Sequence, residues 1–151
     1  MNTKLIAILE DRQIEHIPHE FVGQVHSVAE AQAETGGADH EMIKNVACLT
    51  ANGDMLIVVV PGKSKVDFRA LQGHTGQKVS MAKPDQVLAH TGFPVGGVPS
   101  FGISEVEYFI DEDILDSDRI FTSGGDVYSL IELDPDDLLT LDTYNVGVWS
   151  K

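Results

Sequence analysis

Cysteine, basic residues and long apolar runs are all scarce in this chain of 151 residues. The single cysteine, Cys48, cannot form an internal disulfide, which excludes a disulfide-stabilised fold and favours a reducing, cytoplasmic setting. No window approaches the roughly 18 continuous apolar residues of a membrane span, so no membrane partner is expected. The amino-terminal stretch has one Lys and only five consecutive apolar residues before Glu10, which does not fit a signal peptide.

The shortage of basic residues is marked, with 10 Lys and Arg against 24 Asp and Glu and a net charge of −14. Taken over the whole chain, this charge argues against a protein held to nucleic acid by bulk electrostatics. The imbalance is uneven, because residues 101–151 hold 13 acids and 2 bases (net −11). Residues 42–83 hold six bases and two acids (net +4). This segment predicts a surface that meets an anion, and chance clustering on a solvated surface is the alternative.

The remaining composition is that of a globular protein, with 42% hydrophobic and 23% charged residues. No repeat or linker divides the chain, so a single domain over residues 1–151 is expected. Periodicity and turn residues predict strands over 14–21, 43–51, 54–60, 77–82, 106–111, 119–122 and 127–133. They predict helices over 3–12, 65–72 and 84–91, between Ser27 and Gly36 or Gly37, and from Asp134. The predicted fold class is therefore α+β (mixed α/β), with one central twisted mixed sheet flanked by helices.

Two local patterns sharpen these predictions. Ser27 and Glu30 form a capping box that starts a helix, and Gly36 or Gly37 is placed to end it. Asn52-Gly53 lies between two apolar strands, which predicts a hairpin with a type I′ turn, because that turn needs positive φ at both central residues.

Lys44 is the first candidate for chemistry, because it lies one residue into an apolar strand. In a regular strand it shares a face with Val46 and Cys48, and burying an unpaired ammonium group there is costly. Such a lysine contacts an anion or a carbonyl group, or acts as a nucleophile. The alternative is that Lys44 marks the exposed entrance of the strand. Cys48 itself is interpreted as a small core residue.

The segment 92–102 is the second candidate, with four glycines and two prolines in eleven residues. Such a loop holds backbone N–H groups rigidly and close to a ligand, as an oxyanion or phosphate site requires. A tight surface connection is the alternative. The six histidines form no metal-ligand pattern, and neither a phosphate-loop nor a G-x-S-x-G motif is present, so no metal or cofactor is expected.

In their order and spacing these motifs resemble the YbaK / prolyl-tRNA synthetase-associated editing domain family over roughly residues 4–140. The residues that carry the resemblance are His26-Ser27-x-x-Glu30-Ala31, Met42-Ile43-Lys44, Asn52-Gly53-Asp54, Thr91-Gly92-x-x-Val95-Gly96-Gly97-Val98-Pro99-Ser100-Phe101-Gly102, Asp111, Ser123-Gly124-Gly125, Ile131-Glu132-Leu133 and Asp137-Leu138.

The resemblance implies a YbaK-like fold and a free-standing aminoacyl-tRNA deacylase that clears alanine or cysteine from tRNA for proline. Its implied partners are the acceptor end of mischarged tRNA and prolyl-tRNA synthetase, and no cofactor is implied. Lys44 and Gly96 would be the catalytic residues, and the substrate's own ribose hydroxyl would activate the water. The implied substrate-binding residues are His26, Ser27, Gly92, Gly97, Val98, Pro99, Ser100, Phe101, Gly102, Ser123, Gly124 and Gly125.

Two positions depart from the family pattern. Asp126 stands where many members carry the Arg of an Arg-Gly pair, and Leu130 replaces the aspartate of cysteine-clearing members. Two other functions therefore stay open: a non-catalytic binding module with the same fold, and a hydrolase of another small acyl ester.

Overall fold

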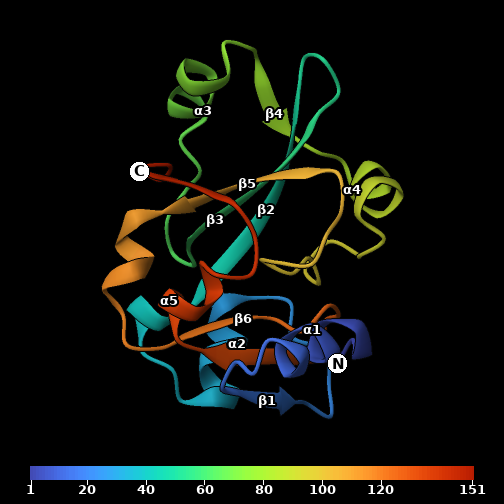
Figure 1. The fold of residues 1–151 in the computed structure, drawn as a ribbon, viewed down its shortest axis with the longest axis vertical. Helices are drawn as coiled ribbons and strands as arrows, with labels where there is room; N and C mark the ends of the chain where they lie inside the picture. Colours follow the sequence, from blue (N-terminus) through green and yellow to red (C-terminus); the bar gives the residue numbers. More distant parts are fainter.

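The computed structural model describes residues 1–151 and arranges eight strands in two sheets (Figure 1). The larger sheet is mixed and has the order β4-β2-β3-β5-β8. Its strands are β2 (Ile43–Thr50), β3 (Met55–Pro61), β4 (Val79–Met81), β5 (Val106–Asp111) and β8 (Tyr144–Gly147). The smaller sheet is antiparallel, in the order β1-β7-β6, and comprises β1 (His16–Glu20), β6 (Ile120–Ser123) and β7 (Ser129–Leu133).

Five α-helices accompany the sheets: α1 (Thr3–Asp11), α2 (Val28–Thr35), α3 (Phe68–Thr75), α4 (Pro84–Thr91) and α5 (Pro135–Leu138). None of them has both the length and the apolar character that crossing a bilayer requires. Figure 1 shows α1 and α2 beside the smaller sheet, with α3 and α4 placed around the larger one. The predicted mixed α/β class and its mixed sheet are confirmed.

The second sheet differs from the expected arrangement of one central sheet. The 3-10 helix η2 (Glu112–Asp116) turns the chain after β5, so β6 pairs with β7 and not with its predecessor. An isolated bridge between Met42 and Phe121 joins the start of β2 to the smaller sheet. Strand β2 therefore connects the two parts of the fold, and its first residues lie where they meet.

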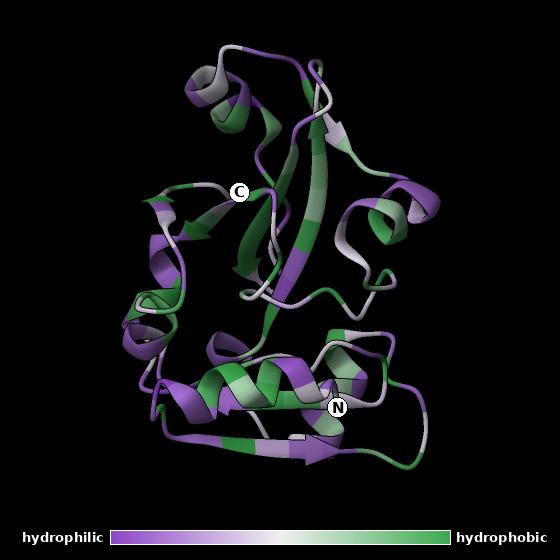
Figure 2. Cartoon of the chain, turned by 45° about the vertical axis from the view of Figure 1, so that its right-hand side comes forward, coloured by the Kyte–Doolittle hydropathy of each residue, from purple (hydrophilic) through white to green (hydrophobic).

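Strand β3 is buried along its apolar residues because both faces of the larger sheet are covered. Side chains alternate between faces, so Ile57 and Val59 join the main core while Val58 and Val60 join a second cluster. Figure 2 shows these central strands mostly in the colour of hydrophobic residues. Lys44 of β2 pairs with Val60.

The ends of the helices follow the predicted caps, with one shift. The Ser27 hydroxyl accepts the Glu30 N–H at 3.1 Å and starts α2, while Gly36 ends it with φ of 72°. The helix predicted over 65–72 begins instead at Phe68, because the Asp67 carboxylate accepts the Ala70 N–H and caps the helix.

The turn between β2 and β3 is not of the predicted type I′. Only Gly53 has positive φ, at 86°, and its N–H donates to the Thr50 carbonyl. The Thr50 N–H in turn donates to the Asp54 carbonyl, which leaves three residues in the loop. A three-residue hairpin of this kind needs one left-handed residue, and glycine supplies it.

Candidate functional site

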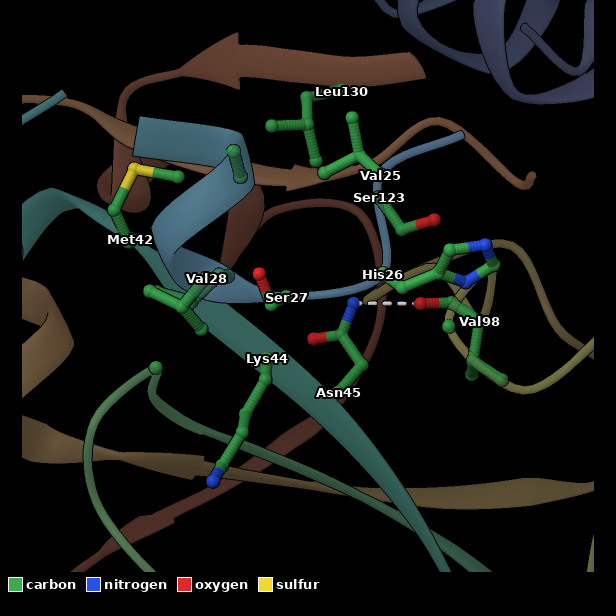
Figure 3. Close-up of a pocket in the computed structure, with 14 residues that line it drawn as sticks. Val25, His26, Ser27, Val28, Met42, Lys44, Asn45, Val98, Ser123 and Leu130 are labelled. Carbon is green, nitrogen blue, oxygen red and sulfur yellow. Dashed lines mark hydrogen bonds between the residues drawn. The ribbon is translucent and has the colours of Figure 1, made fainter. Parts of the chain in front are cut away.

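A cavity of about 310 Å³ opens where the start of β2 meets the smaller sheet (Figure 3). It lies between the beginning of α2, the first residues of β2, the glycine loop 92–102, the end of β6 and the start of β7. Its lining residues are Val25, His26, Ser27, Val28, Ala31, Met42, Ile43, Lys44, Asn45, Gly62, Gly96, Val98, Ser123 and Leu130. Six of the predicted site residues meet here: His26, Ser27, Lys44, Gly96, Val98 and Ser123.

One end of this cavity is apolar. Val25, Val28, Met42 and Leu130 surround it in Figure 3, and Ala31 and Met42 belong to a small hydrophobic cluster with Phe121. No carboxylate is among the lining residues. This end suits a small uncharged side chain.

Lys44 and Asn45 leave β2 on opposite faces of the sheet, as neighbours in a strand do. Val46 and Cys48 share the face of Lys44, as predicted, and pack in or against the second cluster. Figure 3 shows the Lys44 ammonium directed away from Ser27 and Asn45, at the edge of the cavity. Lys44 is half-buried and forms no ion pair with a carboxylate. Its charge is therefore available to an anion.

Asn45 is a site residue that the sequence interpretation missed. Its amide nitrogen donates to the Val98 carbonyl at 2.8 Å and to the Thr122 hydroxyl at 3.1 Å. Its amide oxygen is buried and has no hydrogen-bond partner in the protein. Buried polar atoms are nearly always paired, so this oxygen is a candidate acceptor for a ligand. The sequence feature that could have identified Asn45 is its position as a second polar residue, next to Lys44, in an otherwise apolar strand.

Two residues of the glycine loop that line the cavity, Gly96 and Val98, have unpaired backbone N–H groups. Gly96 has a φ of 85°, and the Gly97 N–H closes a tight turn by donating to the Pro94 carbonyl at 2.9 Å. Neither the Gly96 nor the Val98 N–H donates to another protein group. Because both residues line the cavity, their N–H groups are candidate donors to a developing negative charge.

The loop is held by a close backbone approach at Gly97. A Cβ added there would lie 2.8 Å from the Cα of Asp126. Only glycine allows the loop 92–102 and the loop 123–126 to touch in this way. Gly97 does not line the cavity, but its contact with Asp126 holds the lining residues Gly96 and Val98 in place.

The other predicted substrate-binding residues lie outside the lining: Gly92, Gly97, Pro99, Ser100, Phe101, Gly102, Gly124 and Gly125. Gly92 ends α4 with a φ of 78°, and Phe101 is fully buried in the main core. The Ser100 hydroxyl bonds to that of Thr122, and the Gly102 N–H donates to Asp142. Gly92, Ser100, Phe101 and Gly102 therefore support the loop, because their backbone or side chains are used within the protein.

The aminoacyl-tRNA editing domain family matches residues 22–141, which include every residue that lines the cavity. The chain belongs to this family. The resemblance noted in the motifs is thereby confirmed.

Individual relatives agree with this membership. The uncharacterized protein YwhH of Bacillus subtilis (strain 168) is 32% identical over 114 residues, which are 74% of this chain and 73% of YwhH. A proline–tRNA ligase of Thermosipho melanesiensis (strain DSM 12029 / CIP 104789 / BI429) is 28% identical over 106 residues, or 70% of this chain and 18% of the ligase.

Solved structures share the fold over nearly the whole chain. A crystallised hypothetical protein has a TM-score of 0.92 at 26% identity, covering 98% of this chain and 99% of its own. A protein proposed to be a trans-editing enzyme for prolyl tRNA synthetase has a TM-score of 0.87 at 24% identity, covering 99% and 96%. This second likeness shows the fold.

Asp126 of the editing domain, the departure from the Arg-Gly pair, does not line the cavity. Its carboxylate accepts hydrogen bonds from the Met1 amino group at 2.6 Å, the Ser129 hydroxyl at 2.8 Å and the Tyr128 N–H at 2.8 Å. Burial raises the pKa of Asp126, but these hydrogen bonds outweigh it and hold the pKa below its ordinary value. The Asp126 carboxylate therefore stabilises the loop in which it lies and is not directed at the cavity.

The structure offers neither a reactive thiol nor a metal site in the editing domain. Cys48 is fully buried, and burial raises the pKa of its thiol to about 12. No group of three His, Cys, Asp or Glu side chains is placed to hold a metal ion.

Proposed function

We propose that this editing domain is an aminoacyl-tRNA deacylase, a trans-editing factor that hydrolyses the ester of mischarged alanyl- or cysteinyl-tRNA for proline. The observation that carries the proposal is the pair of unpaired N–H groups of Gly96 and Val98 at one cavity with an apolar end. An aminoacyl ester is already activated, so positioning and oxyanion donors suffice without a protein nucleophile.

The apolar end of the cavity receives the amino acid's side chain. Leu130 and Met42 give a dry surface that suits the methyl group of alanine, and no lining acid is present to bind a polar group. A synthetase cannot strongly reject a smaller side chain, so a second sieve removes what it accepts by mistake. Alanine is therefore the preferred substrate, with cysteine second.

The polar residues orient the ester. The unpaired Asn45 oxygen accepts from the substrate's α-ammonium group, and the Gly96 and Val98 N–H groups donate to the carbonyl oxygen as its charge develops. The Lys44 ammonium, at the edge of the cavity, steadies the phosphate of the terminal adenosine.

The attacking water is activated by the substrate's own ribose hydroxyl. The lining holds no carboxylate, and the one lining histidine, His26, is exposed and bonds through Nε2 to the Gln24 side chain at 2.5 Å. A substrate ending in 2′-deoxyadenosine would therefore bind and resist hydrolysis.

Proline's tRNA and synthetase are supported as partners by the relatives. The proline–tRNA ligase of Thermosipho melanesiensis contains a similar segment within its own chain. A separate editing domain acting on the same class of tRNA would work beside such an enzyme.

Deacylation of alanyl-, cysteinyl- and prolyl-tRNA for proline tests the proposal. We expect hydrolysis of the alanyl ester, slower hydrolysis of the cysteinyl ester and none of the prolyl ester. Leu130→Asp should shift the preference toward cysteine, while Leu88→Asp, the same change at an exposed helix position, should not. Binding of tRNA without hydrolysis of any ester would favour a non-catalytic binding module instead.

A further inference from the structure

A second hollow, of about 410 Å³, lies on the Lys44 face of β2. This basic groove is lined by Lys44, Val46, Lys65, Val66, Phe68, Arg69, Met81 and Lys151. Four of its eight lining residues have cationic side chains and none is Asp or Glu, so the α-carboxylate of Lys151 is the one anionic group among them. The chain has only ten Lys and Arg in total and a net charge of −14, so this concentration points to an anionic ligand.

The cationic side chains of the basic groove are held close together. The Lys151 N–H donates to the Lys65 carbonyl at 2.9 Å and the Lys65 N–H to the main-chain oxygen of Lys151 at 3.2 Å, which fixes the two residues side by side. Arg69 follows in the first turn of α3. No side chain of the groove forms an ion pair, whereas neighbouring Lys63 is engaged by Asp39 at 2.9 Å.

The floor of the basic groove is apolar. Val46, Val66, Phe68 and Met81 form it, and Met81 is 62% exposed. Cations around an apolar floor with an aromatic ring are typical of sites for single-stranded nucleic acid, where phosphates meet the cations and bases stack on the floor. A duplex presents phosphates alone and would not use the floor.

Lys44 borders both the basic groove and the candidate site. A strand whose last nucleotide occupies the cavity therefore enters the groove as it passes this side chain. We propose that the basic groove binds the unpaired nucleotides that precede the terminal adenosine of tRNA. This inference rests on the proposed function, and it assigns the path by which an acidic protein holds its substrate.

Three alanyl esters of increasing length test the inference: alanyl-adenosine 5′-phosphate, which already carries the phosphate assigned to Lys44, an alanylated CCA trinucleotide and an alanylated acceptor-stem minihelix. For the unaltered protein we expect kcat/KM to rise about tenfold or more from the mononucleotide to the trinucleotide, because stacking and phosphate contacts in the groove are added there. In Lys65→Gln/Arg69→Gln this gain should disappear. Lys78→Gln, a neutralisation of an exposed lysine in the same basic segment but outside the groove, should retain it.

Salt dependence gives a second readout. Each lost phosphate contact on a single strand lowers the slope of log affinity against log salt by about 0.7, so the double variant should lose about 1.4. A gain that appears only with the minihelix, or one that survives in the double variant, would overturn the inference.

Binding of an uncharged, fluorescent CCA trinucleotide separates this inference from the deacylase proposal. If no ester is hydrolysed but the trinucleotide binds and the double variant abolishes binding, the groove stands and the deacylase fails. If the esters are hydrolysed but neither kcat/KM nor trinucleotide binding depends on Lys65 and Arg69, the groove fails and the deacylase stands.

Discussion

Replacing Gly97 by alanine perturbs the candidate site through one contact. The added Cβ would lie 2.8 Å from the Cα of Asp126 and 3.1 Å from its carbonyl carbon. Carbon atoms in contact sit about 3.5–4.0 Å apart, so the two loops must separate by roughly 0.7 Å or more. That movement displaces the neighbouring N–H groups of Gly96 and Val98. Since a misplacement of about 1 Å can cost roughly 100-fold in rate, we expect kcat to fall about 10- to 100-fold.

Single-turnover deacylation of alanyl-tRNA for proline measures this effect. Overpacking at the loop contact should also cost about 1–3 kcal/mol of unfolding free energy, so the assay runs well below the variant's Tm. Gly73→Ala is the matched control, because its Cβ would meet nothing within 4 Å. In α3 that change should leave kcat intact and add about 0.5–1 kcal/mol of stability. Wild-type kcat and KM in a folded Gly97→Ala protein would refute the reasoning.

Three further predictions follow from single groups. Lys44→Ala should lower kcat/KM for deacylation about 10- to 100-fold, because a hydrogen bond to a charged phosphate is worth about 1.5–3 kcal/mol, while Lys63→Ala should not. Equal kcat/KM values for Lys44→Ala and the unaltered protein would remove Lys44 from the mechanism. The Arg119 guanidinium donates a hydrogen bond to Glu41 and holds the pKa of that carboxyl below its ordinary value of 4.5. The ion pair therefore stabilises the folded protein fully above pH 4.5, and this stabilisation is lost as the pH falls through the lowered pKa of the folded state. Acid unfolding should therefore begin at higher pH in Arg119→Gln, and an unchanged profile would contradict the pairing. A thiol reagent at pH 8 should leave Cys48 of the native protein unmodified and the activity intact, because burial raises the pKa of that thiol to about 12. In urea the same reagent should label one thiol per chain. Inactivation of the native protein would contradict the role of Cys48 as a core residue.

Features set by neighbouring residues were predictable from the sequence. The cap at Ser27 and the helix end at Gly36 depend on hydrogen bonds within one turn, and both are confirmed. The burial of strand β3 on both faces was also predictable, because a continuous apolar run is typical of a strand whose two faces are both packed against other elements.

Features set by distant contacts were not predictable. Strand β8 is recognisable only through its parallel pairing with β5, more than thirty positions earlier. The importance of Asn45 depends on Val98 and Thr122, which lie 53 and 77 positions away. The role of Asp126 likewise depends on the Met1 amino group, 125 positions away, so the sequence alone suggested a misplaced charge.

The rate of alanyl-tRNA hydrolysis under single-turnover conditions tests the central claim most directly. The unpaired Gly96 and Val98 donors predict a rate at least about 100-fold above spontaneous hydrolysis, since one such donor is commonly worth that factor. A rate equal to spontaneous hydrolysis for both alanyl- and cysteinyl-tRNA for proline would contradict the claim that this cavity is a deacylase site.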